Sequence, residues 1–322
     1  MSAFKAKTDI THAQRTETDA YKASSEVMEK LHKDDSLFYK PWQFSDYNIF
    51  AATLKTTYEE INIWGGQSAM IRPGWKVEEN KVFIPNLFAK VSGVHESIKQ
   101  YRKEIKHLRK QPHTLFFKGF PLFTERYFKP YNKYYYSVLG PSGNIDPNKL
   151  KASQFWKYRY LRTGLQDIMA ERISELCLLH RFKNYQINYN QQPKNSFFDG
   201  VSSFLKQLDI NINLSNREED LPKIKVFEIL NNIDEPFIKL ISQFDYPGNI
   251  PKIVIYNNGK RRSKISFHDA VKLMFMNSMG IDIIIYNPAG YNDIEDFLDE
   301  RYFDIHRLED VAFNLSHKGW FF

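Results

Sequence analysis

Residues 250–322 constrain the fold of this chain more than any other segment, because strand-like and helix-like patterns alternate along it. The segment begins with IPKIVIYNN (250–258), continues with SFHDAVKLMFMNSMG (266–280) and returns to an apolar run in IDIIIYN (281–287). Such alternation predicts parallel strands that are connected by a helix. Ligands of open parallel sheets bind beyond the carboxyl ends of the strands. The pattern therefore also predicts where a site would lie.

The predicted fold class is α/β, with a Rossmann-like parallel-sheet unit at the C-terminus and a largely helical, aromatic-rich middle region. The chain has 322 residues, of which 42% are hydrophobic, so it can bury a large core. The turn cluster LGPSGNIDP (139–147) marks one boundary. The predicted units are a charged N-terminal arm or helix at 1–36, an α/β segment with a basic helix at 37–138, a helical region at 139–222 and the Rossmann-like unit at 223–322.

Three helical regions are predicted outside the C-terminal alternation. Ile98, Tyr101, Ile105 and Leu108 give one apolar face to a basic helix over residues 95–111. The other two regions are residues 148–184 and the stretch from Glu235 to Phe244.

Two further segments are predicted to be extended. KVFEILN (225–231) has the composition of a strand, and VFIPNLFAKV (82–91) is predicted to be a strand that Pro85 interrupts. The VFIPNLF part is apolar enough to add a strand to the C-terminal sheet.

Helix-start signals follow both strands of the C-terminal segment. Ser266 with Asp269, and Asn292 with Glu295, have the three-residue spacing of a capping box. Gly280 is placed to end the first helix in a left-handed conformation. Helix N-termini at this position favour an anion through their free N–H groups and dipoles.

These signals predict a ligand site in the two loops beyond the strands. Lys260, Arg261 and Arg262 would add positive charge, and Gly290 would let the backbone approach a ligand. The side chains of Asn287 and Asn292 can hydrogen-bond a ribose, base or amide. The predicted ligand-binding residues are Asn257, Lys260, Arg261, Arg262, Asn287, Gly290, Tyr291 and Asn292. In the alternative interpretation, these residues only cap helices and turn the chain.

Motifs that are absent from the sequence limit the chemistry of this site. Neither GxGxxG nor GxxxxGK[ST] is present, so ordinary dinucleotide and P-loop binding are not predicted. His268 lies beside Asp269, but no HExxH or clustered histidines accompany it, and no metal site is predicted. No cofactor or catalytic residue is indicated.

Three further acidic or reactive groups have a structural interpretation. The carboxylates between Asp293 and Glu300 are predicted to form an exposed helix face rather than an acid–base or magnesium site. Asp282 is either an edge-strand charge or a buried partner of Arg261. Cys177 is predicted to be an unreactive core thiol.

The net charge of +7 permits an anionic partner but does not identify it. The basic helix at 95–111 and the aromatic stretch at 114–136 are compatible with nucleic-acid binding, although a solvated helix face and core packing are the favoured interpretations. The N-terminus lacks the apolar region of a secretory signal, and the longest apolar run, 281–286, is too short to cross a bilayer. A cytoplasmic location without membrane association is therefore expected.

Several segments of the chain are similar to a known protein family. They are LFYKPWQF (37–44), LKTTYEEINIWGG (54–66), IRPGW (71–75), VFIPNLFAKVSGV (82–94), IDIIIYNPAGYNDIE (281–295) and GWFF (319–322). They resemble the YceG-like family of bacterial tellurite-resistance and general-stress gene clusters, which is unrelated to the murein transglycosylase of the same name. The resemblance implies that other family members are longer, so the charged start of this chain would replace or truncate an N-terminal part.

The resemblance implies a component of the biosynthetic module that these clusters encode, which has been proposed to make a nucleoside-like metabolite. It supplies no catalytic residues. With the predicted site, it leads to the expectation that the chain binds or processes a nucleotide-like or phosphorylated small molecule. Other stress-module proteins are the expected protein partners. The alternative is a non-enzymatic nucleic-acid-binding or scaffold protein of the same stress system.

Overall fold

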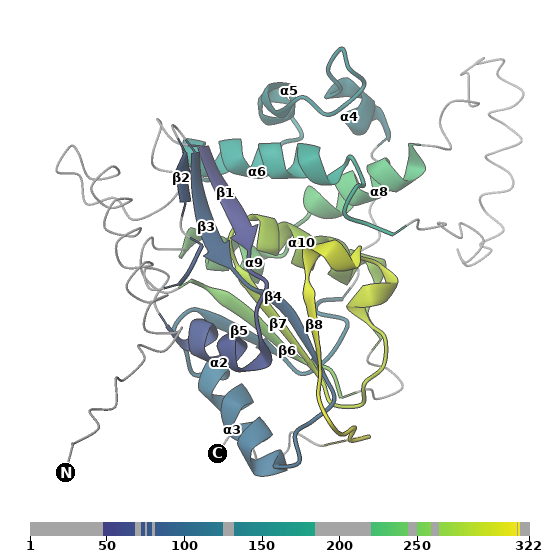
Figure 1. The fold of residues 1–322 in the computed structure, drawn as a ribbon. Helices are drawn as coiled ribbons and strands as arrows, with labels where there is room; N and C mark the ends of the chain where they lie inside the picture. Colours follow the sequence, from purple (N-terminus) through teal and green to yellow (C-terminus); the bar gives the residue numbers. More distant parts are fainter. Residues whose placement is uncertain are drawn as a thin grey trace, which may run out of the picture.

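The computed structural model describes residues 48–67, 72–74, 76–78, 81–124, 132–183, 220–243, 250–258, 264–313 and 315. Helices cover both faces of a central parallel sheet, and a smaller sheet lies beside it (Figure 1). The α/β class that the sequence predicts is confirmed at this level.

The central sheet has five strands in the order β5-β6-β7-β4-β8, and every neighbouring pair is parallel. The strands are β4 (Phe88–Ser92), β5 (Thr114–Phe117), β6 (Lys252–Tyr256), β7 (Asp282–Asn287) and β8 (Asp304–Arg307). β6 and β7 are the two strands predicted from the C-terminal pattern, and they pair from Lys252 with Asp282 to Tyr256 with Tyr286.

Helices bury both faces of β6 and β7, which explains why the residues between Lys252 and Tyr256 and between Asp282 and Tyr286 are all apolar. Ile253 and Ile283 belong to the core on one face, and Val254 and Ile284 to the core on the other. The first core includes residues of α6 (Thr163–Leu176), α8 (Leu221–Leu230), α9 (Glu235–Ser242) and α10 (Phe267–Ser278). The second includes residues of α2 (Tyr58–Gly66) and α3 (Ile98–Arg109).

The smaller sheet has the order β1-β3-β2, with β1 parallel and β2 antiparallel to β3. Its strands are β1 (Asn48–Thr53), β2 (Lys76–Glu78) and β3 (Lys81–Asn86). The predicted extended segment at 82–91 is thus divided between the two sheets. Its C-terminal part, β4, joins the central sheet as expected. The predicted break at Pro85 is wrong: Pro85 lies within β3 opposite Ala52, and the strands separate at Leu87.

One predicted strand is wrong. Residues 225–231 belong mostly to α8, because packing in the core selects the helix. Its apolar residues Ile224, Val226, Phe227, Ile229 and Leu230 are all buried there. A proline in the first turn of α8 also suits a helix start. The helices predicted at 95–111 and 235–244 are confirmed, and the region 148–184 contains α6 and the end of α5 (Pro147–Ala152).

The aromatic stretch packs into the core over the part that the structure describes. The Phe123 ring makes edge contacts with Phe117 and Phe237 at centroid distances of 5.4 and 5.0 Å, and Phe120 is buried. Two tyrosines of the short helix α4 (Asn132–Ser137) are buried as well. Core packing is therefore the correct interpretation for these residues.

Cys177 is buried, and burial raises the pKa of its thiol, as expected for an unreactive core cysteine. No helix among the described residues has the length and apolar character needed to cross a membrane.

Candidate functional site

The carboxyl ends of β6 and β7 bring two predicted site residues together. Asn257 Nδ2 donates to Asp293 Oδ2 at 3.1 Å, and Asn287 Nδ2 donates to the same oxygen at 2.7 Å. Asn287 Nδ2 also donates to the carbonyl of Tyr291 at 2.8 Å. Both asparagines are buried. Their amides therefore hold the loop after β7 in place.

A buried lysine from β4 lies at the centre of this arrangement. Lys90 Nζ is 2.5 and 2.6 Å from the two carboxylate oxygens of Glu295, and 3.0 Å from Asp293 Oδ1. It also donates to the carbonyl of Tyr291 at 2.7 Å. We refer to Lys90, Asn257, Asn287, Asp293 and Glu295 as the carboxyl-edge cluster. A buried ammonium is stable only with such partners.

The two carboxylates of the cluster differ in how they titrate. Burial raises the pKa of Asp293, although Lys90 opposes that shift. Burial also acts to raise the pKa of Glu295, but hydrogen bonds from Lys90 and from the Asp293 N–H outweigh it and hold the pKa below its usual value. The same lysine therefore opposes the rise in the pKa of Asp293 and lowers the pKa of Glu295.

The predicted exposed acidic helix face is wrong for these two residues. Asp293 and Glu295 are buried because they neutralise Lys90, whereas Asp296 and Glu300 are exposed. The predicted cap at Asn292 is also wrong. Asp293 occupies the cap position, and only a 3-10 turn, η5 (Ile294–Asp296), follows before a second such turn, η6 (Glu300–Tyr302).

Three further predicted site residues lie in a turn at the surface. Gly290 has φ = 73°, the Tyr291 ring is 5.9 Å from that of Phe313, and Asn292 is exposed. Lys260, Arg261 and Arg262 lie outside the described residues. The structure therefore brings Asn257 and Asn287 together and places Gly290, Tyr291 and Asn292 around them.

The chain itself closes the carboxyl edge over β4 and β7. The N–H of Val94 donates to the carbonyl of Asp310, and the N–H of Ala312 to that of Pro288, both at 2.8 Å. Gly93 makes this close approach possible, because a Cβ there would lie 2.5 Å from the carbonyl oxygen of Asp310. This leaves the carboxyl ends of β5 and β6 as the part of the edge where a ligand could bind.

The start of α10 lies over this part of the edge. Ser266 and Asp269 form the predicted capping box, with distances of 3.2 Å from Asp269 N to Ser266 Oγ and 3.1 Å from Ser266 N to Asp269 Oδ2. Asp269 Oδ1 also accepts from the N–H of Leu122 at 2.9 Å, which joins the first turn of α10 to the segment after β5. Gly280 has φ = 90° after the helix, as predicted.

A pocket of about 380 Å³ lies beside the first two turns of α10. Its lining includes Lys157, His268 and Lys272 together with the acidic residues Asp234 and Glu235. Lys272 Nζ is 2.6 Å from Asp234 Oδ2. We call this cavity the α10-start pocket. No group of three or more His, Cys, Asp or Glu side chains suited to a metal ion occurs among the described residues.

A second set of buried charges occupies the opposite edge of the sheet. Arg72 Nη1 and Nη2 donate to Asp282 Oδ1 and Oδ2 at 2.7 and 2.6 Å, and Leu87 N donates to Asp282 Oδ1 at 2.9 Å. Asp282 is thus the buried partner of an arginine, as one interpretation predicted, but that arginine is Arg72 rather than Arg261.

Lys252 lies near this ion pair and leads to a prediction about pH. Burial lowers the pKa of Lys252 to about 8, against the opposing charge of Asp282. The unfolded lysine keeps its proton up to about pH 10, so this residue makes the free energy of unfolding rise between about pH 8 and pH 10. Urea titrations at several pH values give the free energy of unfolding of Lys252→Met and of wild type. The value for the variant minus that for wild type should decrease between about pH 8 and pH 10. A difference that does not change with pH would contradict the lowered pKa of Lys252.

Lys90 is the functional candidate that the sequence predictions missed. The available signal was a lysine inside the apolar run LFAKV, since a charge within a buried strand requires a partner. The positions of its partners offered no comparable signal, because they are far away in the sequence.

Together, the sheet and the carboxyl-edge cluster define an α/β protein with a polar, internally neutralised edge. A model of the YceG domain matches residues 55–227 and 202–317. The chain belongs to the YceG family. It is 36% identical over 304 residues to the Uncharacterized protein YceG of Bacillus subtilis (strain 168), and this match covers 94% of the chain. The chain spans about half the length of that relative, 51%. No solved structure matches the chain.

Proposed function

We propose that this protein is a component of a bacterial stress or tellurite-resistance biosynthetic module and binds or processes a nucleotide-like or phosphorylated small molecule. The observation that carries the proposal is the α10-start pocket, which lies beside a helix N-terminus beyond the carboxyl end of β6. In this proposal, β6, α10 and β7 act as a Rossmann-like unit, and the ligand binds over β5 and β6.

The pocket has the size of a small-molecule site, and the helix N-terminus beside it favours an anion. Its volume of about 380 Å³ lies in the range of small-molecule sites. The α10 N-terminus favours an anion through its dipole and first-turn N–H groups. Within the lining, Asp234 pairs with Lys272, Lys157 Nζ donates to Asn232 Oδ1, and Glu235 pairs with Lys239. An anionic ligand would therefore compete with Asp234 for Lys272. Loop residues Lys260, Arg261 and Arg262 connect β6 to α10 in the sequence, so their loop starts and ends at this edge.

The test is a calorimetric titration of the full chain with AMP, ADP, ATP and inorganic phosphate. Lys272→Met and Arg261→Ala should each weaken the strongest of these interactions about tenfold or more, because each removes a charge-assisted contact. Lys99→Met is the control, since Lys99 is exposed on α3 against the other face of the sheet. Thermal unfolding of each variant checks that the fold is retained.

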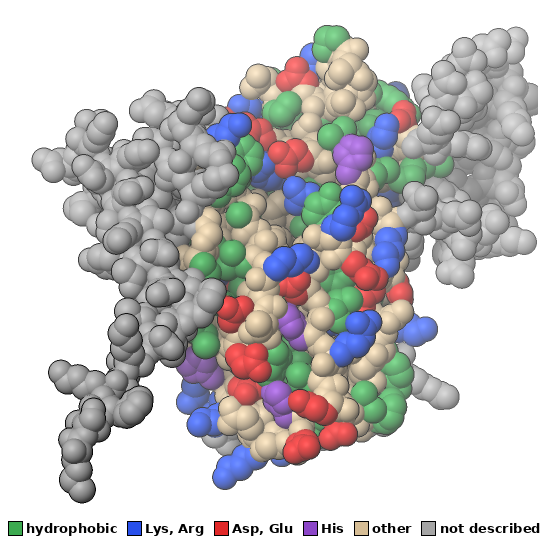
Figure 2. Space-filling view, viewed as in Figure 1, with side chains coloured by type: hydrophobic (Ala, Val, Ile, Leu, Met, Phe, Trp, Pro, Cys, Tyr) green, Lys and Arg blue, Asp and Glu red, His purple; other side chains and the backbone are tan. Residues whose placement is uncertain are grey.

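Two results would favour other functions. The first is binding of single-stranded DNA when none of the small molecules binds. The logarithm of the association constant should then fall by about 0.7 per phosphate contact for each tenfold rise in salt concentration. Such a result would indicate that the protein acts on nucleic acid. Acidic and basic side chains are interspersed on the face shown in Figure 2, which does not resemble a continuous phosphate-binding surface. Stable co-purification of other module proteins without any ligand would instead favour a scaffold.

A further inference from the structure

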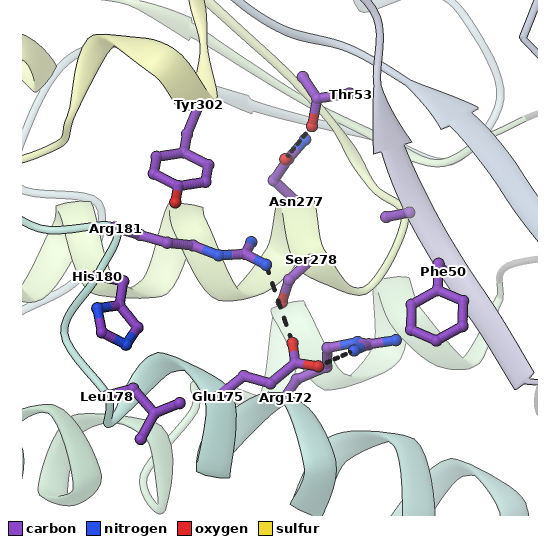
Figure 3. Close-up of a pocket in the computed structure, with 11 residues that line it drawn as sticks. Phe50, Thr53, Arg172, Glu175, Leu178, His180, Arg181, Asn277, Ser278 and Tyr302 are labelled. Carbon is purple, nitrogen blue, oxygen red and sulfur yellow. Dashed lines mark hydrogen bonds and ion pairs between the residues drawn. The ribbon is translucent and has the colours of Figure 1, made fainter.

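A second pocket lies at the other end of α10, between β1, α6 and η6 (Figure 3). Its volume is about 310 Å³, and its lining includes Asn277 and Ser278 of the last helical turn. α10 has 12 residues and is therefore about 18 Å long. The two pockets flank opposite ends of this helix, so they are separate sites.

Two arginines in this pocket are held against aromatic rings. The guanidinium carbon of Arg172 is 5.3 Å from the ring centroid of Phe50, and that of Arg181 is 5.3 Å from the ring centroid of Tyr302. Arg172 is 4% exposed. Stacking on a ring fixes the plane of a guanidinium while its N–H groups remain directed at an anion. The two cations are thus positioned before any ligand binds.

Glu175 is the carboxylate that these arginines share. Its Oε1 accepts from Arg172 Nη1 at 2.7 Å, and its Oε2 is 3.9 Å from Arg181 Nη2 (Figure 3). The Glu175 side chain is 42% exposed, whereas that of Arg172 is 5% exposed. The carboxylate can therefore rotate into water, but the arginine it neutralises cannot.

The charges around the pocket favour one anionic group between the arginines. α6 and α10 end here, and the partial negative charge of a helix C-terminus is about half an elementary charge and acts only over the last turn. These ends offset only part of the two guanidinium charges, so an anionic group beside the arginines is favoured. Glu175 occupies that position in this structure.

We infer that this pocket is a second small-molecule site, in which the phosphate or carboxylate group of a metabolite displaces Glu175 from between Arg172 and Arg181. Planar arginines bind both kinds of group in a bidentate manner. The volume is at the lower end for ligand pockets, which fits a sugar phosphate or a dicarboxylate rather than a dinucleotide.

The displacement of Glu175 gives a test in which two variants change affinity in opposite directions. Ribose 5-phosphate, malonate and inorganic phosphate are titrated calorimetrically into the full chain. Glu175→Gln should raise affinity about tenfold because the competing carboxylate is gone, and Arg181→Met should lower it about tenfold. Glu171→Gln on the same helix is the matched control, because Glu171 is exposed and does not line the pocket. It should leave affinity unchanged.

The same titrations in the Lys272→Met background separate this site from the α10-start pocket. The opposite effects of Glu175→Gln and Arg181→Met should persist there, whether or not Lys272→Met itself changes nucleotide binding. The inference is wrong if none of the three probes binds to the wild type or to Glu175→Gln. It is also wrong if Glu175→Gln and Arg181→Met bind the probes as Glu171→Gln does.

Discussion

Asp282→Ala is expected to lower the free energy of unfolding by about 3–5 kcal/mol, which is the usual cost of removing one partner from a buried ion pair. Arg72 and Asp282 are each 0% exposed, so the guanidinium would remain buried without a counter-ion. The N–H of Leu87, at the junction of β3 and β4, would also lose its acceptor. The loss would therefore affect the junction of the two sheets as well as the start of β7.

Urea unfolding followed by circular dichroism measures this effect, with an unchanged slope indicating a loss of stability alone. Asp296→Ala is the control, because it removes an exposed carboxylate from η5 and should change stability by no more than about 0.5 kcal/mol. Arg72→Met combined with Asp282→Leu should recover most of the loss, since neither charge remains buried. If Asp282→Ala were as stable as Asp296→Ala, the prediction would be wrong, and water would have to reach the Arg72 guanidinium.

Signals within a few residues of one another predicted the strands β6 and β7 and the helix α10 correctly. The central residues of β6 and β7 are apolar because helices cover both faces, and Ser266, Asp269 and Gly280 mark the ends of α10. Those features depend on local backbone preferences and burial, which a sequence shows directly. The proximity of Asn257 and Asn287 was predictable for a related reason, because both lie at the carboxyl ends of parallel strands that the pattern makes neighbours.

Predictions failed where a short pattern fits two structures. The run KVFEILN is strand-like in composition, but its apolar residues can also be buried in a helix, and packing within the core selects α8. Runs of this length cannot be assigned by periodicity alone.

Buried charges were mispredicted because their partners are distant in the sequence. Lys90 and Glu295 are 205 residues apart, and Arg72 and Asp282 are 210 apart. Without those partners, a run such as DIEDFLDE has the composition of an exposed helix. The segment that closes the carboxyl edge, around Asp310 and Ala312, was equally hidden, because it pairs through backbone groups with Val94 and Pro288.

Lys90→Met is expected to destabilise the protein at neutral pH by about 3–5 kcal/mol, because Asp293 and Glu295 would both remain buried without a cation. The carbonyl of Tyr291 would lose a donor in the same change, so the loop after β7 would be held less firmly. Hydrogen exchange of the amides in this loop should therefore be faster in the variant. Lys239→Met is the control, since that lysine pairs with Glu235 at the surface, where its side chain is 70% exposed.

The pH dependence of the Lys90→Met variant distinguishes lost charge neutralisation from lost packing. Without Lys90, burial raises the pKa of both carboxyls above their unfolded values, so the folded variant binds protons that the unfolded chain does not. Stability then falls as pH rises through this interval and recovers on acidification. In wild type, Glu295 has a lowered pKa and contributes stability that acid removes. The difference in urea stability between the two proteins should therefore shrink from about pH 7 to about pH 5. An equal difference at both pH values would assign the loss to the buried stem of Lys90.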